Sequence, residues 1–172
     1  YRQPTYSVSG IAPGEYYLTV KSYDSNFQTE FWSASGSDPD CSNAQLVTVT
    51  GQENLVDFDF QHDPGATIQV TIYESDGITP VSTTTNVVLY SGDPCGSYTN
   101  VTESDNNYLE GKYKLAGITA GTYFIKTYDW WSNIYHDAFY AEPQSTDNCS
   151  SATMITVTPQ EVITGKDLQL SR

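Results

Sequence analysis

The chain has 172 residues, 38 % of them hydrophobic, and carries 21 acidic against 7 basic residues, a formal net charge of −14. Nucleic-acid binding needs a basic face, so this charge argues against a nucleic-acid partner. Since no apolar run reaches the about 18–20 residues of a membrane span, membrane insertion is not expected.

The sequence repeats itself at the scale of a domain. YSVSGIAPGEYYL from Tyr6 is matched 107 residues later by YKLAGITAGTYFI from Tyr113, and CSNAQLVTVT from Cys41 is matched 108 residues later by CSSATMITVT from Cys149. A repeat of this length is a whole domain rather than a solenoid turn. We therefore expect two domains, residues 1–63 as the C-terminal part of a first copy and residues 64–172 as a complete second copy.

The first copy starts at the strand that corresponds to residues 112–118, and it lacks counterparts of the two strands before that point. A half-sandwich of this kind leaves apolar faces and strand edges open. Either the sequence begins within a domain, or another chain supplies the missing strands.

The second copy predicts an all-β sandwich. Helical periodicity is nearly absent, and short runs rich in Val, Ile, Thr, Tyr and Phe alternate with clusters of Gly, Pro, Asn, Asp and Ser. The predicted strands cover residues 66–74, 86–90, 112–118, 122–129, 153–158 and 163–170. A polar loop is expected over residues 91–107 and an aromatic-rich loop over residues 130–148.

The phrases GIAPGEY from Gly10 and GITAGTY from Gly117, each followed by a strand, resemble carboxypeptidase regulatory-like and Cna B-type domains. The resemblance implies tandem prealbumin-like (Ig-like) antiparallel β-sandwiches of secreted and cell-surface proteins. In each phrase we expect the second glycine to occupy a turn that needs a positive φ or a close backbone approach. The tyrosine that follows is expected to point inward. Many Cna B-type domains carry an isopeptide bond from a first-strand Lys; residues 66–74 contain no Lys, so this crosslink is not expected.

The cysteines indicate a disulfide instead, and with it an oxidising compartment. Cys95 and Cys149 lie in the same copy, and we expect them to close a loop of about 55 residues and to stabilise the domain by about 4 kcal/mol. Cys41 corresponds to Cys149, but the counterpart of Cys95 would precede the sequence. Cys41 is therefore expected to bond to a partner outside the chain, to link two chains or to remain free. The competing interpretation is three unpaired thiols.

Two sets of acidic loop residues are candidates for a Ca²⁺ site, because Ca²⁺ prefers oxygen ligands. A solvated acidic surface is the competing explanation, and no DxDxDG loop is present. The two sets are Asp24, Asp38 and Asp40, and Asp129, Asp137 and Asp147.

Aromatic residues gather in the loop at residues 130–148. Exposed aromatic side chains stack on sugar rings or anchor protein interfaces, and Trp130, Trp131 and Tyr135 are the candidates for such a role. The alternative is that the loop folds back as a satellite core. Phe139-Tyr140 aligns with Phe31-Trp32 at the 108-residue offset, which favours packing for that pair.

No nucleophile elbow, HExxH motif or phosphate-binding loop is present, so an enzyme is not expected. The sequence predicts an extracellular structural module of a surface stalk or filament, with neighbouring copies or adjacent domains of the same protein as partners. The alternative is a module that binds a glycan or a surface protein through the aromatic loop. A third hypothesis, compatible with the first, is a filament subunit whose first domain is completed by a neighbour's strands.

Overall fold

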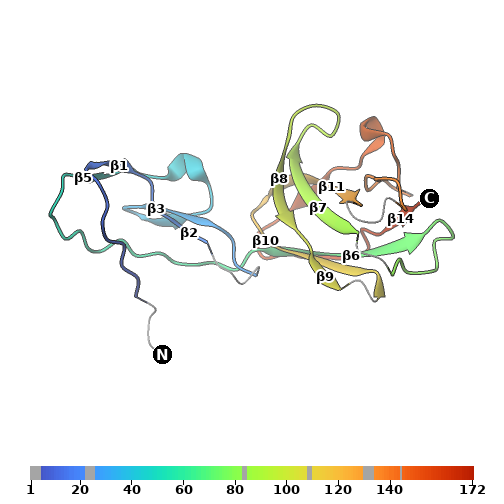
Figure 1. The fold of residues 1–172 in the computed structure, drawn as a ribbon, viewed down its shortest axis with the longest axis horizontal. Helices are drawn as coiled ribbons and strands as arrows, with labels where there is room; N and C mark the ends of the chain where they lie inside the picture. The colour runs from blue at the N-terminus through green and yellow to red at the C-terminus, as the bar shows by residue number, and fades with distance from the viewer. Residues whose placement is uncertain (1–4, 22–25, 83–84, 108–109, 130–133, 144) are drawn as a thin grey trace. The chain divides into compact units, whose positions relative to one another are not determined.

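The computed structural model describes residues 5–21, 26–82, 85–107, 110–129, 134–143 and 145–172. Contacts divide the chain into two compact units (Figure 1). Unit 1 comprises Tyr1–Lys21 and Thr29–Asp63, and unit 2 comprises Ser22–Gln28 and Pro64–Arg172. Strands and short 3₁₀ helices make up both units, so the predicted all-β class is confirmed. In the described ranges, no helix is long and apolar enough to cross a membrane.

The first sheet of unit 2 is built around β6 (Ala66–Glu74). One edge of β6 pairs antiparallel with β10 (Lys112–Ile118), which continues to β9 (Asp105–Asn107). The other edge pairs in parallel with β13 (Val162–Ile163) and β14 (Leu168–Leu170). Buried and more exposed residues alternate along most of β6, as expected for a strand with one face on a core.

The second sheet of unit 2 has the order β12-β11-β7-β8 and is antiparallel throughout. Its strands are β7 (Asn86–Gly92), β8 (Tyr98–Glu103), β11 (Gly121–Tyr128) and β12 (Ile155–Val157). Strands β8 and β9 correct the expected loop over residues 91–107. Most side chains of β8 are exposed, so this edge strand has no apolar alternation by which its sequence could be recognised.

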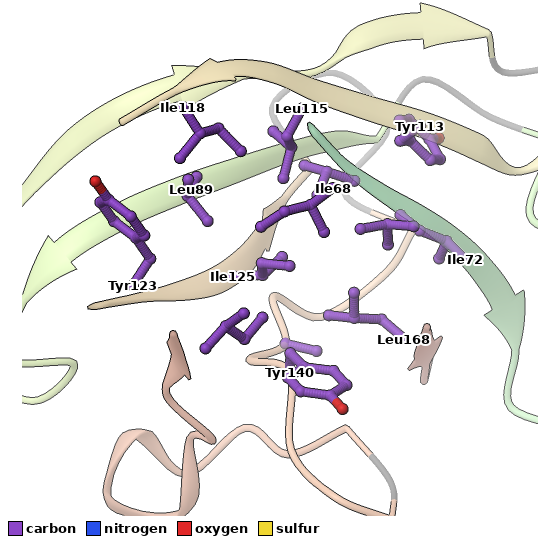
Figure 2. Packing of buried hydrophobic residues seen from close by; sticks show 14 of the residues in the cluster. Ile68, Ile72, Leu89, Tyr113, Leu115, Ile118, Tyr123, Ile125, Tyr140 and Leu168 are labelled. Carbon is purple, nitrogen blue, oxygen red and sulfur yellow. The ribbon is translucent and has the colours of Figure 1, made fainter. Parts of the chain in front are cut away.

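The two sheets face each other across an aliphatic core (Figure 2). Ile68 and Leu115 from the first sheet and Leu89 and Ile125 from the second have no exposed surface. Burial of one such side chain contributes about 1.5–3 kcal/mol. Unit 2 is therefore a β-sandwich held chiefly by residues of β6, β7, β10 and β11.

Unit 1 contains two small sheets. Strand β1 (Gly14–Tyr16) pairs with β5 (Val47–Val49), and β3 (Glu30–Ser33) lies between β2 (Thr19–Val20) and β4 (Gly36–Asp38). The β1–β5 pair repeats part of unit 2, because Gly14 lies opposite Val49 as Gly121 lies opposite Val157, and the following pairs agree as well. The sequence repeat is thus also a repeat of strand register.

The repeated glycine motif forms the same local structure twice. Tyr16 Oη donates to the Ala12 carbonyl at 2.8 Å, and Tyr123 Oη donates to the Thr119 carbonyl at 2.9 Å. A Cβ on Gly121 would lie 2.7 Å from the Tyr123 hydroxyl, so this glycine makes room for the ring of the motif's own tyrosine. The positive φ belongs instead to the first glycine of each motif, at 74° and 68°. Tyr123 is buried and Tyr16 is half-buried.

Candidate functional site

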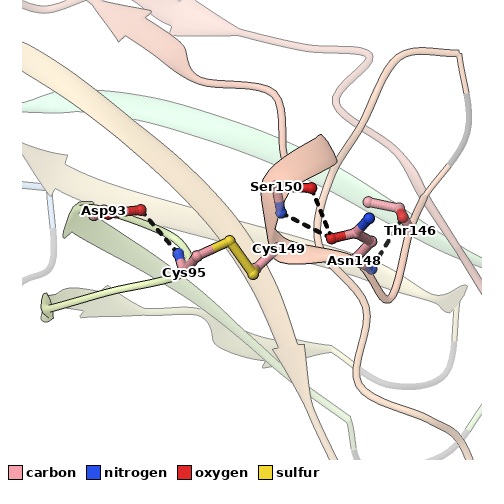
Figure 3. Close-up of a disulfide and its surroundings, with 6 residues drawn as sticks. All are labelled: Asp93, Cys95, Thr146, Asn148, Cys149 and Ser150. Carbon is pink, nitrogen blue, oxygen red and sulfur yellow. Dashed lines mark hydrogen bonds between the residues drawn. A yellow bond between two sulfur atoms is a disulfide. The ribbon is translucent and has the colours of Figure 1, made fainter.

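The disulfide between Cys95 and Cys149 is present, as expected from the sequence (Figure 3). Cys95 lies in the turn between β7 and β8, where its backbone N–H donates to Asp93 Oδ1 at 2.9 Å. Cys149 begins the 3₁₀ helix η3 (Cys149–Ser151), which is capped by Asn148 through a 3.0 Å bond from the Ser150 N–H. Both cysteines of the disulfide are thus positioned by Asx-type turns that form within a few residues.

Cys41 occupies the corresponding place in unit 1 and is exposed and free. It begins the 3₁₀ helix η1 (Cys41–Asn43), and Asp40 caps this helix by accepting from the Ser42 N–H at 2.9 Å. The local geometry that presents Cys149 to its partner is therefore repeated at Cys41. That Cys41 bonds to a partner outside the chain stays a prediction.

The acidic residues expected near Cys41 stabilise the loop that contains them. Asp38 Oδ1 accepts the Asp40 N–H at 2.7 Å, and its other oxygen accepts from the Asn43 side chain at 3.0 Å. The bond from Ser42 keeps the pKa of Asp40 below its ordinary value. The third member of this set, Asp24, lies outside the described residues.

The second acidic set is only partly brought together. Asp129 Oδ2 accepts the Ile134 N–H at 3.1 Å, while Asp137 accepts the Asp129 N–H at 3.3 Å and lies 3.3 Å from Lys126 Nζ. Asp147 is exposed. Among the described residues, no group of three or more His, Cys, Asp or Glu is placed to hold a metal ion. The Asp129 and Asp137 carboxylates instead accept from loop N–H groups, and Asp137 also pairs with Lys126.

Tyr135 is not the exposed aromatic platform that the sequence suggested. Its side chain is 7 % exposed, its hydroxyl donates to Glu74 Oε1, and the Arg172 guanidinium lies 5.5 Å from the ring centre. Burial raises the pKa of Tyr135, and the bond to Glu74 acts in the same direction. Tyr135 is therefore part of the buried cluster and is held at Glu74, the last residue of β6. Trp130 and Trp131 lie outside the described residues.

The alternative interpretation of the aromatic loop, a satellite core, holds for its second half. Phe139 and Tyr140 are buried, and Phe139 packs 5.9 Å from Phe124 of β11. The Phe139 backbone exchanges two hydrogen bonds with Thr146, at 2.7 and 3.0 Å. Residues 138–140 continue the second sheet along the edge of β11, because the Thr127 N–H donates to the Ala138 carbonyl at 2.8 Å and the Tyr140 N–H donates to the Ile125 carbonyl at 2.9 Å.

One repeated hydrogen-bonding motif was not predicted from the sequence. Glu161 accepts from the Thr158 N–H at 2.9 Å and from its hydroxyl at 2.8 Å, and Glu53 receives the same two bonds from Thr50. In both copies the residue before the glutamate has a positive φ, 59° at Gln52 and 60° at Gln160. The sequence could have indicated these bonds, because the motif T-x-Q-E occurs in both copies and resembles a capping box.

Comparison with protein-family models, with curated proteins and with solved structures found no match for this chain. The fold and the site define an all-β protein with one β-sandwich closed by a disulfide. The resemblance to carboxypeptidase regulatory-like and Cna B-type domains rests on the repeated motif and stays a prediction.

Proposed function

We propose that the chain is a non-enzymatic structural module of an extracellular stalk or filament, in contact with neighbouring copies or adjacent domains of the same protein. The observation that carries this proposal is the parallel pairing of the first and last strands of unit 2. Leu168 of β14 lies opposite Ile72 of β6, and Leu170 lies opposite Glu74.

Parallel terminal strands resist tension along the chain for a geometric reason. When the N-terminal end of β6 and the C-terminal end of β14 are pulled apart, the two strands must slide past each other. All the hydrogen bonds between them are then loaded together, whereas pulling both strands from the same end would break them one at a time. This shear arrangement suits a module that transmits tension.

The disulfide also limits how far the chain can extend when the domain unfolds under tension. Cys95 and Cys149 are separated by 54 residues in sequence, and the intervening chain cannot be drawn out while the bond is intact. At about 3.5 Å per residue, the protected length is on the order of 190 Å. The disulfide is also compatible with an oxidising, extracellular location. The alternative of a glycan- or protein-binding module loses Tyr135, which is buried.

Single-molecule force spectroscopy tests the proposal on the full chain. Handles attached before β6, at Pro64, and after β14, at Arg172, load β6 and β14 in shear. The matched control moves the first handle to Gly77, beyond the C-terminal end of β6, so that the same strands are pulled from one end. We expect a several-fold higher unfolding force in the first geometry. Reduction of the disulfide should add about 190 Å to the length released on unfolding.

Equal unfolding forces in the two geometries would contradict the proposed mechanical role. So would an unfolding length that does not change on reduction, because the disulfide would then protect nothing from extension.

A further inference from the structure

The second sheet of unit 2 has an aromatic outer face. Leu89 of β7 and Ile125 of β11 belong to the aliphatic core, so the side chains that alternate with them point away from it. Among these are Tyr90 and Phe124, whose rings stack 5.4 Å apart across the two strands. Tyr98 of β8 makes edge-type contacts with both rings, at 4.9 and 5.6 Å. Phe124 is fully buried, whereas Tyr98 is 43 % exposed, so this face leaves the Tyr98 ring partly open to solvent.

Asn100 lies on the same face, beside Tyr98. Residues 98–100 pair in regular register with β7, and Asn100 lies opposite Tyr90. Because side chains two positions apart on a strand share a face, those of Tyr98 and Asn100 project side by side. Asn100 is exposed, and its Nδ2 donates to Glu103 Oε1 at 2.9 Å. An asparagine amide is thus presented to solvent next to an exposed aromatic ring.

Asn100 also begins the tripeptide Asn-Val-Thr, which is an acceptor sequence for N-linked glycosylation. The register with β7 shifts between Asn100 and Thr102, so Val101 is the additional residue of a β-bulge. Strand β8 is the last strand of its sheet, and Val101 is exposed as well. The acceptor sequence is therefore accessible on the surface of unit 2.

A second tripeptide of this type, Asn148-Cys149-Ser150, is held differently. Cys149 is bonded to Cys95, and the Ser150 N–H and hydroxyl both donate to Asn148 Oδ1, at 3.0 and 2.9 Å (Figure 3). The residue two positions before the asparagine is Thr146 rather than an aromatic residue. Since the disulfide and these bonds fix the tripeptide in the 3₁₀ helix η3, we expect no glycan there.

We propose that Asn100 carries an N-linked glycan whose first sugar packs on the ring of Tyr98. The sugar is supplied as an oligosaccharide bound to a lipid diphosphate, and an oligosaccharyltransferase catalyses the transfer. Asn100 Nδ2 forms a bond to the anomeric carbon, the bond from that carbon to the diphosphate breaks, and the lipid diphosphate leaves. The nitrogen gives up one of its two protons to a base of the transferase. The remaining N–H continues to donate to Glu103.

The surroundings of Asn100 indicate the kind of sugar. The C–H groups of a sugar ring pack on an aromatic ring, and covering Tyr98 removes apolar surface from water. Glu103 is exposed next to the attachment point, and the chain carries a formal net charge of −14. Because like charges repel, the first sugar is expected to be neutral rather than acidic.

Peptide mapping by mass spectrometry tests the attachment on the protein isolated from its natural source. We expect the peptide that contains Asn100 to carry sugar mass, and peptide:N-glycosidase to release the sugar and leave aspartate at that position. The peptide that contains Asn148 should carry none. In the natural host, Asn100→Gln should remove the glycan, and Asn148→Gln, the matched control, should not.

Hydrogen exchange of the β8 amides before and after enzymatic release of the glycan tests the packing on Tyr98. Release should raise the opening constant of β8 about three- to tenfold in the parent chain. In Tyr98→Ala the same release should change it less than about twofold, because the contact is already absent. Thr99→Ala is the matched control, since Thr99 is exposed and points to the opposite face; it should respond as the parent chain does.

The proposal uses the extracellular location given under the proposed function but not the mechanical role, and the same peptide map separates the two failures. Asn100 without sugar, or sugar only at Asn148, in a chain with the Cys95–Cys149 disulfide intact would overturn the glycan site alone. Asn100 without sugar in a chain with both cysteines reduced would overturn the site together with the extracellular location. An equal response of the parent chain and Tyr98→Ala to glycan release would overturn the packing on Tyr98.

Discussion

Units 1 and 2 contain matching sequence in different surroundings. Both form the turn in which the motif's tyrosine donates to a backbone carbonyl four residues earlier, and both form the capped 3₁₀ helix. Both also have the hydrogen bond from a threonine hydroxyl to the glutamate three residues later. They differ where long-range pairing is needed. Residues 112–118 form β10 against β6, while residues 5–11 form no strand in unit 1. Turns and caps therefore follow from local sequence, and strands form only where a partner edge is present.

The comparison also shows that core burial stabilises the two units unequally. The aliphatic core lies in unit 2 and is made largely from β6 and its neighbours. The counterparts of several of its members are exposed in unit 1. Substitutions at matching positions should therefore have unequal effects, and native-state hydrogen exchange can measure the free energy of opening of each unit separately.

The largest expected effect comes from the disulfide. Replacement of Cys95 and Cys149 by serine should lower the free energy of unfolding of unit 2 by about 4 kcal/mol, because a closed loop of 55 residues constrains the unfolded chain. Hydrogen exchange of β7 and β11 amides measures the loss. Cys41→Ser is the matched control and should change neither unit. An equal loss from Cys41→Ser would show that this thiol is not free.

The second-largest expected effect comes from truncating apolar side chains at matching positions of the two units. Leu115→Ala should destabilise unit 2 by about 3 kcal/mol, since it removes a fully buried side chain and leaves a cavity. Val8→Ala, at the matching position of unit 1, should change stability by less than about 0.5 kcal/mol. Similar losses in both units would mean that residues 6–11 are packed in solution.

The tyrosine hydroxyls give a smaller difference. Tyr123→Phe should cost unit 2 about 1 kcal/mol, because the half-buried Thr119 carbonyl and hydroxyl lose their partner. Tyr16→Phe should cost unit 1 less, since the Ala12 carbonyl is exposed to water. The two variants keep the ring, so exchange rates in the two turns report the hydrogen bond alone. A larger loss in unit 1 would contradict the assignment of burial.

The smallest effect is a loss of stability at alkaline pH. Burial raises the pKa of Tyr140, and the bond to Glu142 acts in the same direction. Above the ordinary tyrosine pKa of 10.0, the unfolded chain has released this proton while the folded chain still holds it, so the stability of unit 2 falls as pH rises. Thermal unfolding between pH 8 and 11 should show the decrease, and Tyr140→Phe should reduce its slope. An unchanged slope would assign the decrease to other groups.

Much of unit 2 could be predicted from its residues. The alternation in ATIQVTIYE indicates a strand with one buried face, and β6 has the bounds predicted for it. The prediction for the C-terminal strand was less accurate. One strand was expected over residues 163–170, but Gly165, with φ at 72°, separates β13 from β14. Both pieces are short and pair with β6 in parallel, an interaction between residues about 95 positions apart. No local pattern encodes such a partner.

Of the candidate site residues, some could be predicted from the sequence and others could not. The pairing of Cys95 with Cys149 was accessible because the repeat and the cysteine count leave few alternatives. The role of Tyr135 was not, because an aromatic loop residue looks the same in sequence whether it faces water or, as here, Glu74 and Arg172.

The sequence by itself determined the all-β class, the repeat, the disulfide and the turns, because each depends on composition, on spacing or on bonds between residues a few positions apart. Only the tertiary structure decided which apolar residues are buried and which strands lie side by side. Burial depends on the strand that covers a residue, and β6 is near in space but distant in sequence from most of what it covers. Without a strand at that position, the repeated residues of unit 1 keep their local structure and leave their apolar side chains exposed.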